Sequence, residues 1–315
     1  MLAGIDIGGS KTELCIAAGA ERRGRSMPTS DWRTRTDPRA DAAALITALT
    51  ELGGAPDILV VGSHGCDTDD ECRNFQQRLA DRLPGTVLVL NDAELLLAAA
   101  GKERGIAVIA GTGSIAVARK DDRRMIAAGG WGWYLGDEGS ASGLVREAAR
   151  AVRGSIDAGE PLEQLGRGLL LALGIDSPVE LGRALSDRGS AAKIGGLAPL
   201  VFEAADSGSG LALAVIGQGG QALAALTTRV LGRGAPGADV VTGGGVVTRQ
   251  PRLFEAFRNA LSSVAPQLSL SLLKEPPVTG AIALAERLQA GERPSYLPLP
   301  HIAGRALSEA EWRAA

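Results

Sequence analysis

Cysteine is scarce in this sequence, and Cys15, Cys66 and Cys72 are its three examples in 315 residues. A sparse, odd set of this kind does not supply the disulfide framework of a small secreted domain. Residues 1–4 also lead directly into an alternating apolar strand, without the basic leader and apolar core of a signal peptide. We therefore expect a reducing compartment, the cytoplasm by default. A zinc site at Cys66 and Cys72 would need a second ligand pair at metal-site spacing, which is lacking.

The sequence also has few aromatic residues, a small net charge and no long apolar run. Aromatic residues make up 3% of the chain, and the formal net charge is −3. Such a chain has no bulk attraction for nucleic acid or anionic lipid, and no apolar run reaches the about 18 residues that a membrane helix needs. The basic run from Arg22 to Arg35 is interrupted by polar residues, and we interpret it as a solvated hairpin or loop. We expect neither a nucleic-acid partner nor a membrane partner.

What the sequence does contain is an α/β pattern that begins twice. The first pass has the order βββαβαβα, with two strands around a tight turn in residues 2–18, helices at 40–52, 71–83 and 93–100, and strands at 58–62 and 86–90. The second pass has strands at 106–110 and 115–119, a Gly- and Trp-rich loop at 129–143, a long helical region at 144–233, a strand at 238–242 and a helix ending near residue 290.

This restart predicts an internal duplication. We expect one domain in residues 1–105 and a second in 106–290, with a loosely attached Pro-rich tail at 291–315 that could complete the first domain. Two α/β domains that face each other would leave a cleft between them, where ligands of such proteins usually lie.

Two glycine-rich turns, one in each half, are the candidate phosphate sites. Glycine lets backbone N–H groups approach an anion, and Ser and Thr hydroxyls add further donors. The spacing of a Walker loop is absent, so hairpin amides would hold the phosphates in place of a helix N-terminus. A plain hairpin turn is the alternative for either motif alone, and the repetition favours phosphate binding. The candidates are Gly8, Gly9, Ser10, Lys11 and Thr12 in the first turn, and Gly111, Thr112, Gly113 and Ser114 in the second. Asp6, just before the first turn, is a candidate to hold Mg²⁺ through water.

Three further motifs complete the candidate site. Asp92 follows a strand in Asn91-Asp92-Ala93 and could accept the proton of an attacking hydroxyl, although an N-cap for the helix at residue 93 is the alternative. The segment from Gly129 to Ser140 combines aromatics with acids, which suits a sugar, with a glycine-rich loop around a buried aromatic anchor as the alternative. The triple glycine after the strand at 238–242 is where a flat base could enter closely, a weak signal by itself.

In order, the segments GIDIGGSKT, NDA, AGTGSIA, GGWGWYLGDEGSASG, VVTGGGVV and PPVTGAIALA resemble the BadF/BadG/BcrA/BcrD ATPase family, and within it the N-acetylglucosamine kinase branch of the actin/hexokinase/Hsp70 superfamily. The resemblance runs from Leu2 to about Ala290. It implies two ribonuclease H-like α/β domains with a cleft between them, ATP with Mg²⁺, phosphate transfer to a sugar 6-hydroxyl, a homodimer and domain closure.

The same resemblance implies the role of each motif. Asp92 would be the catalytic base, and the two turns would bind phosphate. Adenosine would lie at Gly243, Gly244 and Gly245, and the sugar at Asn91, Asp92, Thr112, Gly113, Trp131, Asp137 and, more weakly, His64.

Departures from the family pattern leave the substrate open. Ile115 stands where animal members have a sugar-binding Asn, and His64 and Asp67 stand where small apolar residues are common. They could favour a free amine or another acyl group, with His64 as a satisfied core histidine as the alternative. We expect N-acetylglucosamine first, then glucosamine or N-acetylmuramic acid, and glucose is not excluded. More remote alternatives are an ATPase activator of a redox enzyme, which would need clustered thiolates, and a sugar-sensing regulator, for which no helix-turn-helix is evident.

Overall fold

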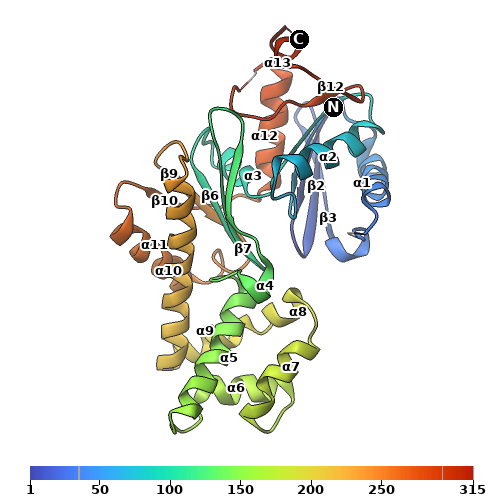
Figure 1. The fold of residues 1–315 in the computed structure, drawn as a ribbon. Coiled ribbons are helices and arrows are strands. Elements are labelled where there is room, and N and C mark those ends of the chain that lie inside the picture. Colours follow the sequence, from blue (N-terminus) through green and yellow to red (C-terminus); the bar gives the residue numbers. More distant parts are fainter. Residues whose placement is uncertain (35, 293, 315) are drawn as a thin grey trace.

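The fold, seen in a computed structural model, contains two β-sheets with helices around them (Figure 1). The structure describes residues 1–34, 36–292 and 294–314, so Arg35 at the end of the basic run lies outside it. The first sheet has the order β12-β11-β5-β4-β1-β2-β3, and the second has the order β10-β9-β6-β7-β8. The strands are β1 (Leu2–Ile7), β2 (Lys11–Ala18), β3 (Glu21–Pro28), β4 (Ile58–Ser63), β5 (Thr86–Leu90), β6 (Ile106–Ala110), β7 (Ser114–Arg119), β8 (Met125–Gly129), β9 (Asp239–Gly243), β10 (Ser269–Leu272), β11 (His301–Ile302) and β12 (Arg305–Ala306).

The two sheets repeat one topology. In the first, β1 pairs antiparallel with β2 and parallel with β4; in the second, β6 pairs antiparallel with β7 and parallel with β9. The order 5-4-1-2-3 in the first sheet therefore corresponds to 10-9-6-7-8 in the second. The expected α/β class with two such units is confirmed, and this shared order is what an internal duplication produces.

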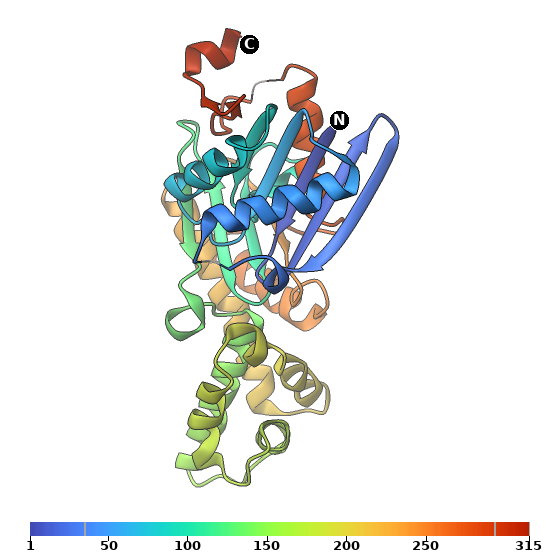
Figure 2. The ribbon, with the colours of Figure 1, turned by 90° about the vertical axis from the view of Figure 1, so that its right-hand side faces the viewer.

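Helices cover the sheets, and a group of helices extends away from them (Figure 2). That extension corresponds to the long helical region expected from the sequence, which is broken into separate helices by caps such as Ser190 and Ser209 and by the left-handed Gly174. The helices are α1 (Pro38–Gly53), α2 (Asp69–Ala80), α3 (Glu94–Ala99), α4 (Gly132–Leu135), α5 (Ala141–Asp157), α6 (Gln164–Leu173), α7 (Leu181–Asp187), α8 (Ala191–Gly195), α9 (Ala198–Asp206), α10 (Gly210–Gly232), α11 (Pro251–Val264), α12 (Val278–Gln289) and α13 (Glu309–Ala314).

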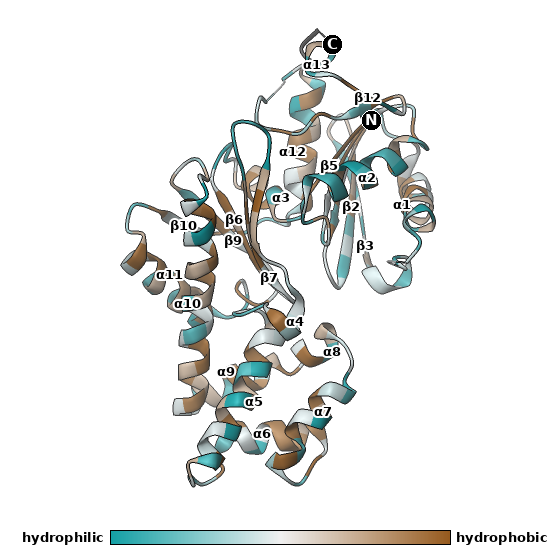
Figure 3. Cartoon of the chain, viewed as in Figure 1, coloured by the Kyte–Doolittle hydropathy of each residue, from teal (hydrophilic) through white to brown (hydrophobic). Residues whose placement is uncertain are grey.

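Apolar residues concentrate between these layers. Strands β6 and β9 are hydrophobic along most of their length, whereas the surface helix α2 is largely hydrophilic (Figure 3). Helix α10 is long and apolar enough to cross a membrane by length and composition, but half of that stretch is buried inside the protein, where α10 packs against α11 and α5. A core helix passes the same test, so we interpret α10 as part of the second unit's core.

Two expectations about the end of the chain are wrong. Helix α12, which we assigned to the second domain, packs on the first sheet, because Ala281 and Ile282 share a buried cluster with Leu2 and Val60. The tail is not loosely attached: β11 pairs with β5 at the edge of the first sheet, and Leu297 is buried in the same cluster. Residues 293 and 315 of this tail lie outside the described residues.

Candidate active site

The two glycine turns, about a hundred residues apart in sequence, meet in space. Ser10 Oγ lies 2.9 Å from Thr112 Oγ1, so one hydroxyl donates to the other across the two units. Each turn is closed by its own backbone bond, from Gly8 N–H to the carbonyl of Lys11 at 2.9 Å and from Gly111 N–H to the carbonyl of Gly113 at 3.0 Å. The structure therefore brings together the two motifs that the sequence singled out for phosphate.

The side chains of the first turn do not all face this junction. Thr12 is completely buried; its hydroxyl accepts a bond from Trp32 Nε1 at 3.1 Å and lies 2.9 Å from Thr29 Oγ1. Thr29 Oγ1 in turn donates to the carbonyl of Gly8 at 2.9 Å. This chain of hydroxyls fixes the turn from behind. Lys11 pairs with Glu13 at 2.7 Å, with its side chain mostly exposed.

A half-buried carboxylate, Asp6, lies near the end of β1, and a buried one, Asp92, follows β5. Asp92 is 6% exposed, and burial, followed by repulsion from Asp6 and Asp67, holds its pKa well above the usual range. Burial, with a further contribution from Glu13, raises the pKa of Asp6 to about 7. Helix α3 has no side-chain cap on its first turn, so the alternative in which Asp92 caps this helix is not observed. Perturbed carboxylates that repel one another are typical of sites where proton transfer or cation binding occurs.

Asn91 connects Asp67 to the strand end that carries Asp92. Its Nδ2 donates to Asp67 Oδ1 at 3.0 Å and to the carbonyl of Cys66 at 3.1 Å, and its Oδ1 accepts from Ala93 N–H at 3.0 Å. The side chain is completely buried. Asn91 thus positions Asp67, and its amide groups are already occupied within the protein; it does not present them to a sugar as expected. Asp67, which the sequence suggested as a departure but did not place in the site, faces the same junction.

Asp137 packs against the second turn. Its Oδ1 accepts from Ser114 N–H at 3.1 Å, and a Cβ at Gly113 would lie 2.9 Å from the same oxygen, so position 113 has no room for a side chain. Asp137 has the left-handed φ of 60°, is 5% exposed and has a pKa raised by burial. The hydroxyl of Ser114 donates to the carbonyl of Glu138 at 2.8 Å, so it supports the loop and is not directed outward.

The aromatic loop lies beside these acids. A Cβ at Gly130 would lie 3.5 Å from Asp67 Oδ2, which places the loop backbone next to that carboxylate. Trp131 is 73% exposed, whereas Trp133 stacks on Tyr134 with ring centroids 3.9 Å apart. The segment includes the short helix α4, where the sequence indicated a loop. Arg146, which sequence reasoning missed, donates to the carbonyl of Gly136 at 2.6 Å and thereby anchors the loop to α5.

His64 and the triple glycine border the two turns. A Cβ at Gly9 would lie 3.5 Å from His64 Nε2, so His64 lies beside the first glycine turn. Gly244 has φ of 110°, and a Cβ there would lie 2.7 Å from the carbonyl of Ala110, which explains why glycine is required just after β9, where the chain passes the end of β6. Beside Gly245 the space is open. The triple glycine therefore adjoins the second glycine turn.

Within the described part of the chain, no group of three His, Cys, Asp or Glu side chains is arranged to hold a metal ion directly. Cys66 and Cys72 are both buried, and the Cys72 thiol donates to the carbonyl of Cys66 at 3.5 Å.

Comparisons with known proteins identify the family of the chain and relatives that share its fold. The model of the BadF/BadG/BcrA/BcrD ATPase family matches residues 3–284. An N-acetylmuramic acid/N-acetylglucosamine kinase of Clostridium acetobutylicum is 27% identical over 297 residues, which cover 90% of this chain and 97% of the relative. The crystal structure of a candidate N-acetylglucosamine kinase from Chromobacterium violaceum is 26% identical with a TM-score of 0.66, and the match covers 90% of this chain and 98% of that one. A ROK family glucokinase from Streptomyces griseus, solved with glucose and AMPPNP, shares the fold at 17% identity with a TM-score of 0.58, over 90% of this chain and 98% of that one.

Proposed function

Because the chain belongs to the BadF/BadG/BcrA/BcrD ATPase family, we propose that it is an ATP-dependent sugar kinase that transfers the γ-phosphate of ATP to the 6-hydroxyl of an amino-sugar. The observation that carries this proposal is the meeting of the two glycine turns at Ser10 and Thr112, with Asp92 and Asp137 buried beside them. Phosphoryl transfer requires mainly positioning and charge stabilisation, and this junction offers amides and hydroxyls for phosphates next to a carboxylate base.

In this proposal Asp92 accepts the proton of the sugar hydroxyl. Burial and the neighbouring Asp6 and Asp67 raise its pKa, which makes the carboxylate a stronger base than an exposed Asp. Asp137 and the exposed Trp131 bind the sugar, the carboxylate through hydroxyl groups and the indole through the apolar face of the ring. Backbone amides and the Ser10 and Thr112 hydroxyls take the phosphates.

The carboxylates fit the Mg²⁺ that ATP-dependent phosphoryl transfer requires. Asp6 and Asp92 are both disfavoured as anions by burial and by neighbouring acids, so a bound cation would relieve their repulsion. Mg²⁺ prefers one or two carboxylates and keeps several waters, which matches Asp6 as a ligand through water. The ion would neutralise charge on the β- and γ-phosphates.

We infer an N-acetylated amino-sugar as the acceptor, with N-acetylglucosamine first. The Clostridium acetobutylicum relative is named as a kinase of both N-acetylmuramic acid and N-acetylglucosamine, and the Chromobacterium violaceum protein is a candidate N-acetylglucosamine kinase. Glucosamine stays an alternative because Asp67 adds negative charge beside the loop. We also propose a cytoplasmic homodimer, which light scattering on the purified protein would test.

The experiment that tests the function is ADP release from Mg-ATP with N-acetylglucosamine, N-acetylmuramic acid, glucosamine and glucose in parallel, with the phosphorylated position assigned by NMR. We expect ADP release to depend on one or two amino-sugars and the product to carry phosphate on the 6-oxygen. ADP release at the same rate without any sugar would contradict a kinase and favour an ATPase that activates a redox partner.

A further inference from the structure

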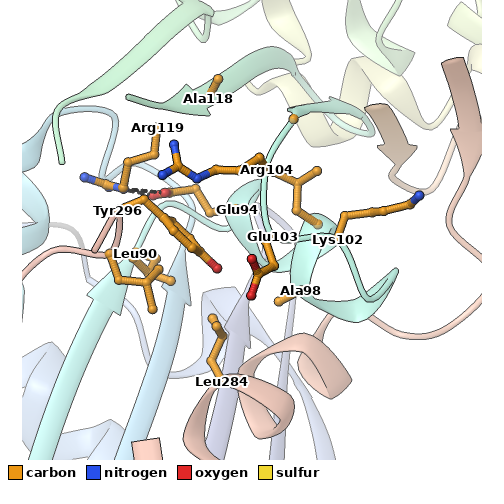
Figure 4. A pocket seen from close by; sticks show the side chains of 13 residues that line it. Leu90, Glu94, Ala98, Lys102, Glu103, Arg104, Ala118, Arg119, Leu284 and Tyr296 are labelled. Carbon is orange, nitrogen blue, oxygen red and sulfur yellow. Dashed lines mark hydrogen bonds and ion pairs between the residues drawn. The ribbon is translucent and has the colours of Figure 1, made fainter. Parts of the chain in front are cut away.

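A buried ion pair joins the two units behind the glycine turns. Arg119 on β7 of the second sheet holds Glu94 on α3 with two bonds, from Nε to Oε2 at 2.6 Å and from Nη2 to Oε1 at 2.8 Å (Figure 4). Its third nitrogen, Nη1, donates to Asp69 Oδ1 on α2 at 2.7 Å. Arg119 is 5% exposed and Glu94 is 8% exposed. Because the guanidinium is on the second unit and both carboxylates are on the first, this pair crosses the boundary between them.

Glu94 also contacts the strand end that carries Asp92. Its Oε1 accepts a bond from Asn91 N–H at 3.2 Å, in addition to the bond from Arg119. Asn91 is the residue before Asp92, and its side chain holds Asp67. One carboxylate therefore connects the ion pair of the domain boundary to the backbone that positions the proposed base.

The surroundings of the pair indicate a structural junction and not a ligand site. The cavity that it lines has room of about 30 Å³, which is space for about one water. Other charged groups around the cavity are paired, Arg104 with Asp121 and Glu103 with Arg287. Helix α3 itself is wedged between the units, because Leu95 packs in the cluster of the first sheet and Leu96 in that of the second.

We propose that Glu94 is a positioning residue for the phosphoryl transfer, which fixes Asp92 through the backbone of Asn91 and is itself oriented by Arg119 from the opposite unit. A buried ion pair is often no more stabilising than a neutral pair of similar volume. The presence of this pair is explained if Glu94 Oε1 has a second role, which is to accept the Asn91 N–H bond. The inference rests on the proposed kinase function and on Asp92 as its base.

The test compares two double variants that both remove the charges of Glu94 and Arg119 and leave Asp69 in place. Glu94→Gln with Arg119→Gln retains an oxygen that can accept the Asn91 N–H bond, whereas Glu94→Met with Arg119→Met has similar volume and no such acceptor. We expect kcat of the methionine pair to fall on the order of tenfold to a hundredfold, as small misplacements of catalytic groups do, and kcat of the glutamine pair to stay within about threefold of the wild type. The KM for ATP should be unchanged in both. Each kcat is expressed per ATP-binding site, measured by titration, so that partial unfolding does not enter the comparison.

Equal kcat values for the two pairs would overturn the inference. If the methionine double variant does not bind ATP, the glutamine double variant still tests the inference. A folded glutamine double variant whose kcat is reduced tenfold or more would contradict the positioning role of Glu94. Glu286→Gln, which breaks the exposed ion pair with Arg22 at 2.6 Å, is the control and should keep the wild-type kcat. Asp92→Asn is assayed in parallel: if it stays active, the proposed base is wrong; if it is inactive while the two pairs agree, the positioning role alone fails.

Discussion

Replacement of Asp92 by asparagine should lower activity and raise stability at the same time. The substitution keeps the size of the side chain and removes both its charge and its basicity. General-base catalysis contributes on the order of a hundredfold to ten-thousandfold in rate, which corresponds to about 2.7 to 5.5 kcal/mol in the activation barrier. We therefore expect kcat of Asp92→Asn to fall by at least about a hundredfold, with little change in the affinity for ATP.

The stability effect follows from the burial of this carboxylate. In the folded state its pKa is raised by burial and by Asp6 and Asp67, so the folded protein retains a proton that the unfolded chain has already lost. Stability is therefore lost as pH rises from the unfolded value near 3.8 through the folded pKa. Asparagine removes this penalty, which is about 1–3 kcal/mol for a buried, poorly compensated group, and the melting temperature should rise by several degrees.

The two measurements are a coupled ADP-release assay and a thermal melt at pH 8, both without and with the sugar. Activity above a few per cent of wild type would remove Asp92 from the role of base. A lower melting temperature would show that the carboxylate stabilises the fold and would refute the electrostatic reasoning, whatever happened to the rate.

Two further predictions concern the residues around Asp92. Gly113→Ala should raise the KM for the sugar and lower kcat, because the new Cβ would lie 2.9 Å from Asp137 Oδ1 and must displace that carboxylate. The control is Gly168→Ala, where nothing lies within 4 Å of the new Cβ. Equal KM and kcat values for the two variants would contradict this account. Asp6 keeps its proton up to about pH 7 in the folded state and loses it near 3.8 when unfolded, so wild-type stability should decline across this interval. Thermal melts between pH 5 and 8 should show that the melting temperature of Asp6→Asn falls less steeply with pH than that of the wild type. If the two melting temperatures change in parallel, the raised pKa of Asp6 is wrong.

The sequence predicted those parts of the fold that depend on local pattern. Alternating strands around Gly8 and Gly111 identify two hairpins by themselves, and their repetition predicts that they belong to equivalent units. The position of α12 could not be predicted in this way, because its apolar face suits either sheet. Close contact decides it: a Cβ at Gly4 of the first sheet would lie 2.9 Å from Ala281.

The site was predictable in its motifs and not in its hydrogen bonds. Asn91 and Asp92 are neighbours in sequence and were both expected at the sugar. The side-chain amide of Asn91, however, forms its hydrogen bonds with Cys66, Asp67 and Ala93. Arg119 and Glu94 are 25 residues apart, and nothing in the sequence distinguishes them from solvated charges. Their pairing depends on how two sheets approach each other, which single-sequence patterns do not encode.

The contact between the two glycine turns has a consequence for substrate entry. Asp92 and Asp137, the proposed base and sugar ligand, are 6% and 5% exposed, so surrounding groups have to move before a sugar hydroxyl gains full access to either carboxylate. The two hydroxyls belong to different units, and a single exposed hydrogen bond between them contributes only about 0.5–1.5 kcal/mol to stability. This one bond therefore contributes little to holding the turns together, and a polyphosphate that accepts bonds from both hydroxyls would replace it.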